Sequence, residues 1–105
     1  MEENQVIDTS ILIEGKTGLT TAFNAVEYPK ALERKGVEVL WPVKDDFLSA
    51  IAIMIDLLRV GKPVPAIDVL IAATCIRRGL PFVTRDQHFE IIKSIRPDFK
   101  ITLAK

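Results

Sequence analysis

Short apolar runs that are typical of strands alternate along this chain with longer segments that are typical of helices. The runs that we expect to form strands are residues 4–8, 19–23, 37–41, 81–84 and 99–103. The segments that we expect to form helices are residues 25–35, 45–60 and 66–78, each followed by a glycine, and a short helix or turn at 86–94. This alternation predicts an α/β fold with a parallel sheet of four or five strands flanked by helices.

The connection between the first two predicted strands is short. Residues 11–18 provide only eight positions, whereas a parallel crossover usually takes about a dozen residues or more. Residues 10–14 can make a turn or a short helical piece, but we expect no full crossover helix. One face of the sheet should therefore be thinly covered.

Composition limits the class of protein. The length of 105 residues predicts a single domain, residues 1–105. The chain has 14 basic and 14 acidic residues, and this zero net charge excludes a polycationic protein that coats nucleic acid. Cys75 is the only cysteine, so no internal disulfide can form. We expect Cys75 to lie in the core and the protein to be located in the cytoplasm. The longest apolar segment, residues 47–58, is shorter than the roughly 20 residues of a membrane helix.

Four acids stand in apolar surroundings where one edge of a sheet can gather them. Asp8 ends the first predicted strand, and Asp86 follows the strand at 81–84 after one residue. Ligands of parallel sheets bind beyond the carboxyl ends of the strands. Asp68 and Glu27 lie near the starts of two predicted helices. Because converging carboxylates repel, and because Mg²⁺ and Mn²⁺ prefer oxygen ligands, we predict a divalent metal site that activates water at a phosphodiester.

Each acid also has an ordinary structural explanation. Asp8, followed by Thr9 and Ser10, can be a helix N-cap, and so can Asp68 after Pro65. Capping accounts for most acids at such positions. The strand-end placement of both Asp8 and Asp86 weakens this explanation but does not remove it.

Three segments resemble motifs of the PIN domain family, most closely of its VapC-type toxins. They are Val6–Glu14 (VIDTSILIE), Ala66–Thr74 (AIDVLIAAT) and Gly79–Phe89 (GLPFVTRDQHF). The resemblance covers nearly the whole chain and implies a PIN-like parallel sheet. It also implies a metal-dependent endoribonuclease that cleaves single-stranded RNA with Mg²⁺ or Mn²⁺, as the toxin of a toxin–antitoxin pair. The chain resembles a shortened member, because Glu27 lies only 19 residues beyond Asp8.

The resemblance implies roles for individual residues. The acids that match the family's catalytic and metal-binding positions are Asp8, Glu27, Asp68 and Asp86. The accessory positions that would orient carboxylates or water are Ser10, Asn24 and Thr84. Asn24 falls where many relatives have Thr or Ser, and it is also a plausible N-cap of the helix at 25–35. Arg85 is expected to contact an RNA phosphate at the edge of the site.

Other side chains have less specific expectations. We expect His88 to be a surface or partly packed residue, because a carboxylate site for a hard metal does not call for imidazole. Trp41 and Phe82 are expected in the core rather than stacked on bases. Arg77 and Arg78 can contact RNA phosphates or simply be solvated.

The segment at 47–58 is apolar nearly all round, which is typical of a helix buried on more than one side. A chain of this size has little core in which to bury it, so we expect a homodimer. The expected partners are therefore RNA, an antitoxin protein and a second copy of the chain.

Two alternatives to a ribonuclease come from other functional classes. A non-catalytic PIN-like module would bind RNA or a partner protein without cutting, and failure to bind Mg²⁺ or Mn²⁺ would favour it. A phosphoacceptor domain built on Asp8 is a poor match, because the segment Thr84-Arg85-Asp86 offers no lysine.

Overall fold

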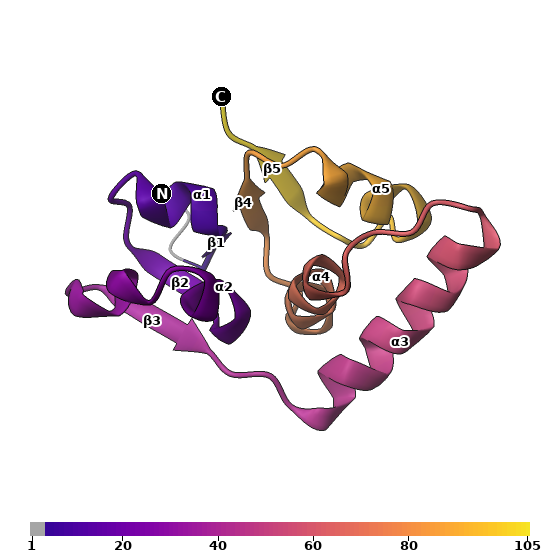
Figure 1. Ribbon diagram of the computed structural model, residues 1–105, viewed down its shortest axis with the longest axis horizontal. Coiled ribbons are helices and arrows are strands. Elements are labelled where there is room, and N and C mark those ends of the chain that lie inside the picture. Colours follow the sequence, from indigo (N-terminus) through magenta and orange to yellow (C-terminus); the bar gives the residue numbers. More distant parts are fainter. Residues whose placement is uncertain (1–3) are drawn as a thin grey trace.

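Five strands form one parallel sheet in the computed structural model, which describes residues 4–105 (Figure 1). The strands are β1 (Val6–Ile7), β2 (Gly18–Thr21), β3 (Val37–Leu40), β4 (Phe82–Thr84) and β5 (Ile101–Leu103). Their order across the sheet is β3-β2-β1-β4-β5, and every neighbouring pair is parallel. The predicted α/β fold is confirmed.

The chain changes direction across the sheet between β1 and β4. From β1 it moves outward through β2 to β3, and it then returns to place β4 and β5 on the other side of β1. In open parallel sheets, ligands bind beyond the carboxyl ends of the strands at such a switch point. Asp8 directly follows β1 and Asp86 closely follows β4, so the fold brings these two acids to the switch point.

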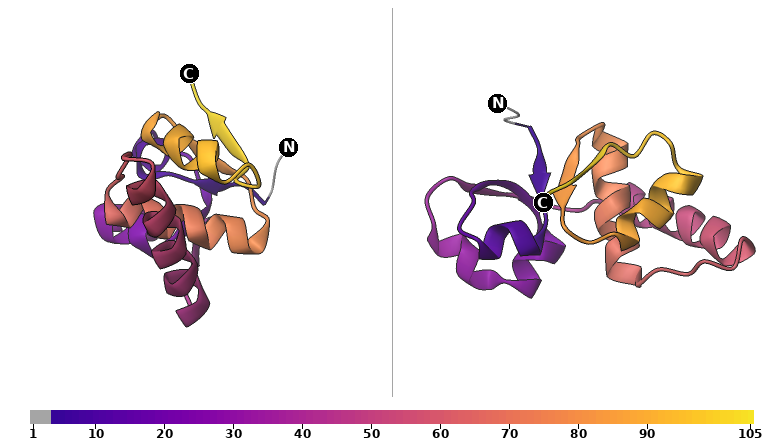
Figure 2. Two further views of the ribbon diagram at one scale, coloured as in Figure 1. Left: turned by 90° about the vertical axis from the view of Figure 1, so that its right-hand side faces the viewer. Right: turned by 90° about the horizontal axis from the view of Figure 1, so that it is seen from above.

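The helices of the structure are α1 (Thr9–Ile13), α2 (Ala22–Glu27), the 3₁₀ helix η1 (Pro29–Glu33), α3 (Lys44–Arg59), α4 (Ala66–Arg78) and α5 (His88–Ile95). Helices α4 and α5 cover one face of the sheet, and α3 packs against these two helices. Helices α3, α4 and α5 share the main core with the inward side chains of the strands. Helix α4 lies between α3 and the strands β1, β2 and β3 (Figures 1 and 2). No helix within residues 4–105 has the length and apolar character needed to cross a membrane.

Alternation along the strands separates two cores. Val6 and Phe82 face the main core, where the rings of Phe82, Phe89 and Phe99 pack together. Ile7 and Val83, one residue further along each strand, face the opposite side, as the two-residue period of a strand requires. That side is covered by a smaller cluster from α1 and η1.

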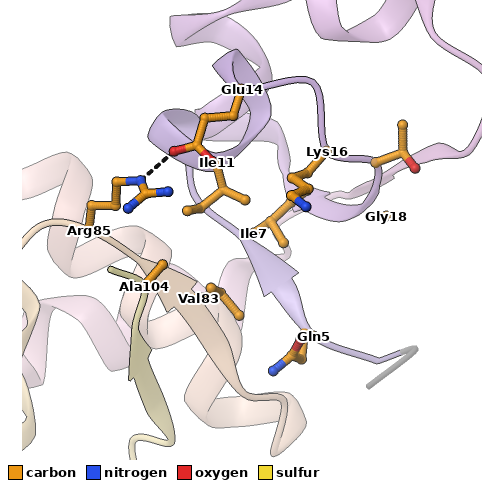
Figure 3. Close-up of a pocket in the computed structure, with 10 residues that line it drawn as sticks. Gln5, Ile7, Ile11, Glu14, Lys16, Gly18, Val83, Arg85 and Ala104 are labelled. Atoms are coloured by element: carbon orange, nitrogen blue, oxygen red, sulfur yellow. Dashed lines mark hydrogen bonds and ion pairs between the residues drawn. The ribbon is translucent and has the colours of Figure 1, made fainter. Parts of the chain in front are cut away.

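The first crossover is short, as predicted, but it does contain a helix. The five residues of α1 fold because Asp8 caps them: its side chain accepts a hydrogen bond from the Thr9 amide at 2.8 Å. A helix of this length leaves part of the sheet open. A hollow of about 420 Å³ lies there, with Ile7, Ile11 and Val83 among its lining residues (Figure 3).

The prediction of one helix over residues 25–35 is wrong, because the structure has two shorter helices there, α2 and η1. Helix α2 begins at Ala22 and is capped by Thr21, whose side chain accepts from the Asn24 amide at 3.2 Å. Asn24 is therefore inside the helix and is not its N-cap. Pro29 has no amide hydrogen to continue the helix, and the chain passes into η1.

Of the two aromatic residues expected in the core, Phe82 and Trp41, only Phe82 lies there. Phe82 is buried, but Trp41 is 71% exposed, because it lies after the end of β3, where the chain leaves the sheet toward α3. Cys75 is a core residue as expected, and burial raises the pKa of its thiol to about 12.

Candidate functional site

A cleft of about 400 Å³ opens at the switch point of the sheet. Its lining includes all four acids selected from the sequence and residues beside them: Asp8, Thr9, Ser10, Glu27, Asp68, Arg85 and Asp86. The four acids come from the end of β1, the end of α2, the first turn of α4 and the segment after β4. Elements far apart in the sequence therefore contribute carboxylates to one place.

Asp8 is the most firmly held of the four acids. It is 8% exposed, and its Oδ1 accepts from the Thr9 amide at 2.8 Å and from Asn24 Nδ2 at 2.9 Å. Its Oδ2 accepts from the Thr84 hydroxyl at 2.5 Å. Burial raises the pKa of Asp8, and the charge of Glu27 adds to this, while the hydrogen bonds from Thr84, Thr9 and Asn24 oppose it. Asp8 is thus both a helix cap and a member of the acid cluster.

Of the three expected accessory residues, Asn24 and Thr84 contact Asp8. Asn24 is fully buried and is itself oriented by Thr21, whose hydroxyl donates to Asn24 Oδ1 at 2.6 Å. The Thr84 hydroxyl oxygen also accepts from the Asp86 amide at 2.9 Å. Thr84 therefore links the two strand-end acids through one side chain.

Thr9 belongs to the hydrogen-bond network of the cleft, a role that was not expected from the sequence. Its hydroxyl donates to Glu27 Oε1 at 2.6 Å and accepts from Asn24 Nδ2 at 3.0 Å. Glu27 is thereby tied to the same network as Asp8. The available signal was the hydroxyl directly after Asp8, which starts a helix beside the cleft.

Ser10 lines the cleft, but its hydroxyl has no hydrogen-bond partner within residues 4–105, although the oxygen is buried. A buried polar atom without a partner carries a desolvation cost unless a water or ligand satisfies it. Ser10 therefore has a free donor and acceptor beside the acids.

Asp68 is a partly buried acid surrounded by other carboxylates. It lies in the first turn of α4, with no side-chain capping bond, so the capping explanation does not account for it. Burial, and after it the negative charges of Asp86, Asp8 and Glu27, raise its pKa to about 6. His88 acts in the opposite direction. A bound cation would relieve this repulsion.

Asp86 lies beside Asp68 and close to His88. Its Oδ1 accepts from the His88 amide at 2.9 Å, and the imidazole Nδ1 lies 3.3 Å from the same oxygen. One ligand atom from each of Asp68, Asp86 and His88 can be chosen so that all three lie within 4.8 Å of one another. Within residues 4–105 this compact group does not include Asp8 or Glu27, although both line the same cleft. The carboxylates of Asp68 and Asp86 are oxygen ligands of the kind that Mg²⁺ and Mn²⁺ bind.

Arg85 lies at the rim of the cleft. Its Nε forms an ion pair with Glu14 Oε2, and its Nη1 donates to the carbonyl of Lys105. Figure 3 shows this ion pair beside the hollow under α1, which Arg85 also lines. The guanidinium is therefore partly neutralised by Glu14 rather than directed at the four acids.

Arg77 and Arg78 have a structural role that the sequence analysis did not anticipate. Both donate to the buried Oδ1 of Asp46 at 2.8 Å, and Arg78 also donates to the Trp41 carbonyl. Burial alone would raise the pKa of Asp46, but the hydrogen bonds from Arg78, the Val43 amide and Arg77 bring it to about 2. These contacts join the start of α3 to the end of α4, outside the acid cleft.

Comparison with known families gives one match. The model of the PIN domain family matches residues 24–94, which is more than half of the chain and includes Glu27, Asp68 and Asp86. The resemblance found in the sequence is thus confirmed. A comparison with curated proteins gives no match.

Comparison with solved structures gives similar folds over nearly the full length. A chain of VapBC-5 from Mycobacterium tuberculosis, a member of the VapBC family of toxin-antitoxin systems, has a TM-score of 0.77 at 22% identity, covering 96% of this chain and 99% of that one. A chain of VapBC2 from Rickettsia felis, bound to a promoter DNA fragment, has a TM-score of 0.77 at 14% identity, with 94% and 97% covered. DNA-bound VapBC from Salmonella typhimurium gives 0.76 at 20% identity, with 94% and 96% covered.

Proposed function

The chain belongs to the PIN domain family, and on this basis we propose that it is a metal-dependent endoribonuclease that cleaves single-stranded RNA. The observation that carries the proposal is the gathering of four carboxylates in one cleft at the switch point of the sheet. Burial and the repulsion from the neighbouring acids together raise the pKa of Asp68, and this is costly for the fold alone. It is useful to a protein that binds a divalent cation there.

The residues of the cleft supply what such a centre needs. Asp8, Asp68 and Asp86 would hold Mg²⁺ or Mn²⁺ directly or through water, and Glu27 would complete the ligand set. When bound, the ion would lower the pKa of a water and orient it for in-line attack on phosphorus. This chemistry requires no side-chain nucleophile, and Cys75 is buried away from solvent.

The hydrogen-bond network would keep the ligands in place. Asn24 and Thr84 hold the two oxygens of Asp8, while Thr9 holds Glu27. Such outer contacts fix ligand orientation and commonly affect metal affinity or activity by about 10–100-fold. The hydroxyl of Ser10, which has no partner within residues 4–105, would hold a water in the cleft. Arg85 would contact an RNA phosphate from the rim, where Glu14 positions its guanidinium.

We also propose that the protein is the toxin of a toxin–antitoxin pair that acts in the cytoplasm. Support comes from the VapBC complexes that share its fold. An antitoxin protein would then be a partner in addition to RNA.

We propose that the protein forms a homodimer through the outer face of α3. On the inner face of this helix, Ala50, Ile53 and Leu57 are buried against the core. The large apolar residues of this helix that remain exposed are Phe47, Leu48, Ile51, Ile55 and Leu58. A second copy would cover this face, as the apolar pattern of residues 47–58 predicts.

The test is cleavage of end-labelled single-stranded RNA by the purified protein with Mg²⁺, with Mn²⁺ and with EDTA. We expect cleavage only with metal, and a loss of at least about a hundredfold in Asp8→Asn and in Asp86→Asn. Asp56→Asn is the matched control, because it removes the same charge from an exposed position on α3. Activity that survives EDTA would contradict the proposal. RNA binding without cleavage in any metal would favour the non-catalytic module instead.

A further inference from the structure

We propose that the imidazole of His88 is a further ligand of the ion in the acid cleft, and that it makes the site select Mn²⁺ over Mg²⁺. The inference rests on the proposed function for the presence of an ion. From the sequence alone, His88 is expected to be a surface or partly packed residue rather than a ligand. The carrying observation is the joint placement of His88, Asp68 and Asp86.

The separation of His88 from Asp86 is close to that of neighbouring ligands around one cation, and Asp68 lies slightly further out. Ligand atoms at about 2.1 Å from an octahedral ion lie about 3.0 Å apart when adjacent and about 4.2 Å apart when opposite. The observed separation of His88 Nδ1 from Asp86 Oδ1 is 3.3 Å, and the ligand atoms of all three residues lie within 4.8 Å of one another. Small side-chain adjustments would therefore complete the geometry.

The backbone also favours this arrangement. The His88 amide donates to Asp86 Oδ1 at 2.9 Å, which fixes the start of α5 against the acid. The imidazole side chain is 63% exposed, so it can move toward an ion without disturbing the core. The backbone therefore holds His88 beside Asp86, and Asp68 lies close to both from the first turn of α4.

An ion pair between His88 and Asp86 alone would be the simpler explanation, but it leaves Asp68 with its repulsive neighbours. A cation bound by all three residues would account for the closeness of His88 to Asp86 and would also offset the repulsion between Asp68 and its acidic neighbours. The chemistry of the donor then determines which cation is preferred. An imidazole nitrogen binds transition-metal dications better than Mg²⁺, which favours oxygen ligands and keeps its waters.

The direct test is pulsed electron paramagnetic resonance of the Mn²⁺-loaded full chain. Coordination by His88 should produce nitrogen-14 modulation of the Mn²⁺ electron spin echo, and His88→Gln should abolish it. Gln87→Ala is the matched control, because it changes the adjacent exposed residue at the start of α5 and should retain the modulation. Circular dichroism of each variant verifies that the fold is intact.

Calorimetric titration tests the selectivity. We expect the Kd for Mn²⁺ to rise at least about tenfold in His88→Gln, while the Kd for Mg²⁺ changes less than about twofold. Equal losses for both ions would overturn the inference. Tight Mn²⁺ binding that depends on Asp8 but lacks nitrogen modulation in the unsubstituted protein would overturn it while leaving the proposed function standing. Absence of any Mn²⁺ binding would overturn both.

Discussion

Replacing Asp68 by Asn should stabilise the protein in the absence of metal. A carboxyl with a pKa of about 6 in the folded chain, against an ordinary value of 3.8, is destabilised on folding by about 3 kcal/mol at neutral pH. The cleft is open to solvent, and screening reduces this to about 1–2 kcal/mol. Asn also loses the attraction of the α4 N-terminus for a negative charge, about 0.5 kcal/mol. The net gain should be about 1 kcal/mol.

The gain should depend on pH in a defined direction. Because the folded pKa is raised, the folded chain binds the extra proton between pH 6 and 3.8. The destabilisation caused by burial and by the neighbouring acids is therefore fully present above about pH 6, declines as the pH falls through this range, and is absent below 3.8. The advantage of Asp68→Asn should be greatest at pH 7.5 and should disappear near pH 4.

Thermal and urea denaturation in EDTA across this pH range measure the effect. A gain of 1 kcal/mol corresponds to a rise in Tm of about 5 °C for a domain of this size. Glu90→Gln is the control, because it removes an acid from the first turn of α5 that does not line the cleft, and it should not raise Tm. The reasoning fails if Asp68→Asn is no more stable than the unsubstituted chain at pH 7.5, or if its advantage is the same at pH 4.

Three further substitutions test the contacts around the cleft and the core. Asn24→Ala should lower the free energy of unfolding by about 1–3 kcal/mol in urea titrations, because buried Asp8 loses a donor; unchanged stability would contradict this. Arg78→Ala should cost about 3 kcal/mol by the same measurement, because buried Asp46 loses the two guanidinium contacts that Arg78 makes with it, and a loss under 1 kcal/mol would refute this. Ile51→Glu should shift sedimentation equilibrium from about twice the 11.7 kDa chain mass to the chain mass; an unsubstituted protein that is already monomeric would exclude the proposed dimer.

The broad plan of the site was predictable from the sequence because it depends on topology. Once β1 and β4 are recognised as parallel strands, Asp8 and Asp86 must lie at one edge of the sheet. The short crossover was also visible in the spacing of Asp8 and Glu27. Its helix was underestimated because eight residues are few for a crossover, although the possible capping role of Asp8, which the structure shows, was visible in the sequence.

The finer contacts depend on side-chain packing between distant segments. Nothing local to Arg78 indicates that it contacts Asp46, which lies 32 positions earlier. Glu14 and Arg85 are 71 positions apart, so their ion pair was equally hidden. Trp41 was misassigned because a strand-like apolar run does not reveal where the chain leaves the sheet. The ion pairs of Arg78 and Arg85 depend on tertiary partners, whereas Trp41 was misassigned because the strand ends one residue earlier, at Leu40.

The most direct measurement of the central claim is product analysis after a single turnover of RNA in ¹⁸O-labelled water with Mn²⁺. Attack by an activated water breaks the phosphodiester and leaves one solvent oxygen on the product phosphate. Mass spectrometry should therefore find one ¹⁸O in that terminal phosphate and no 2′,3′-cyclic phosphate, with no product from Asp8→Asn. A 2′,3′-cyclic phosphate without solvent oxygen would show attack by the RNA's own hydroxyl and would contradict a metal-activated water in the acid cleft.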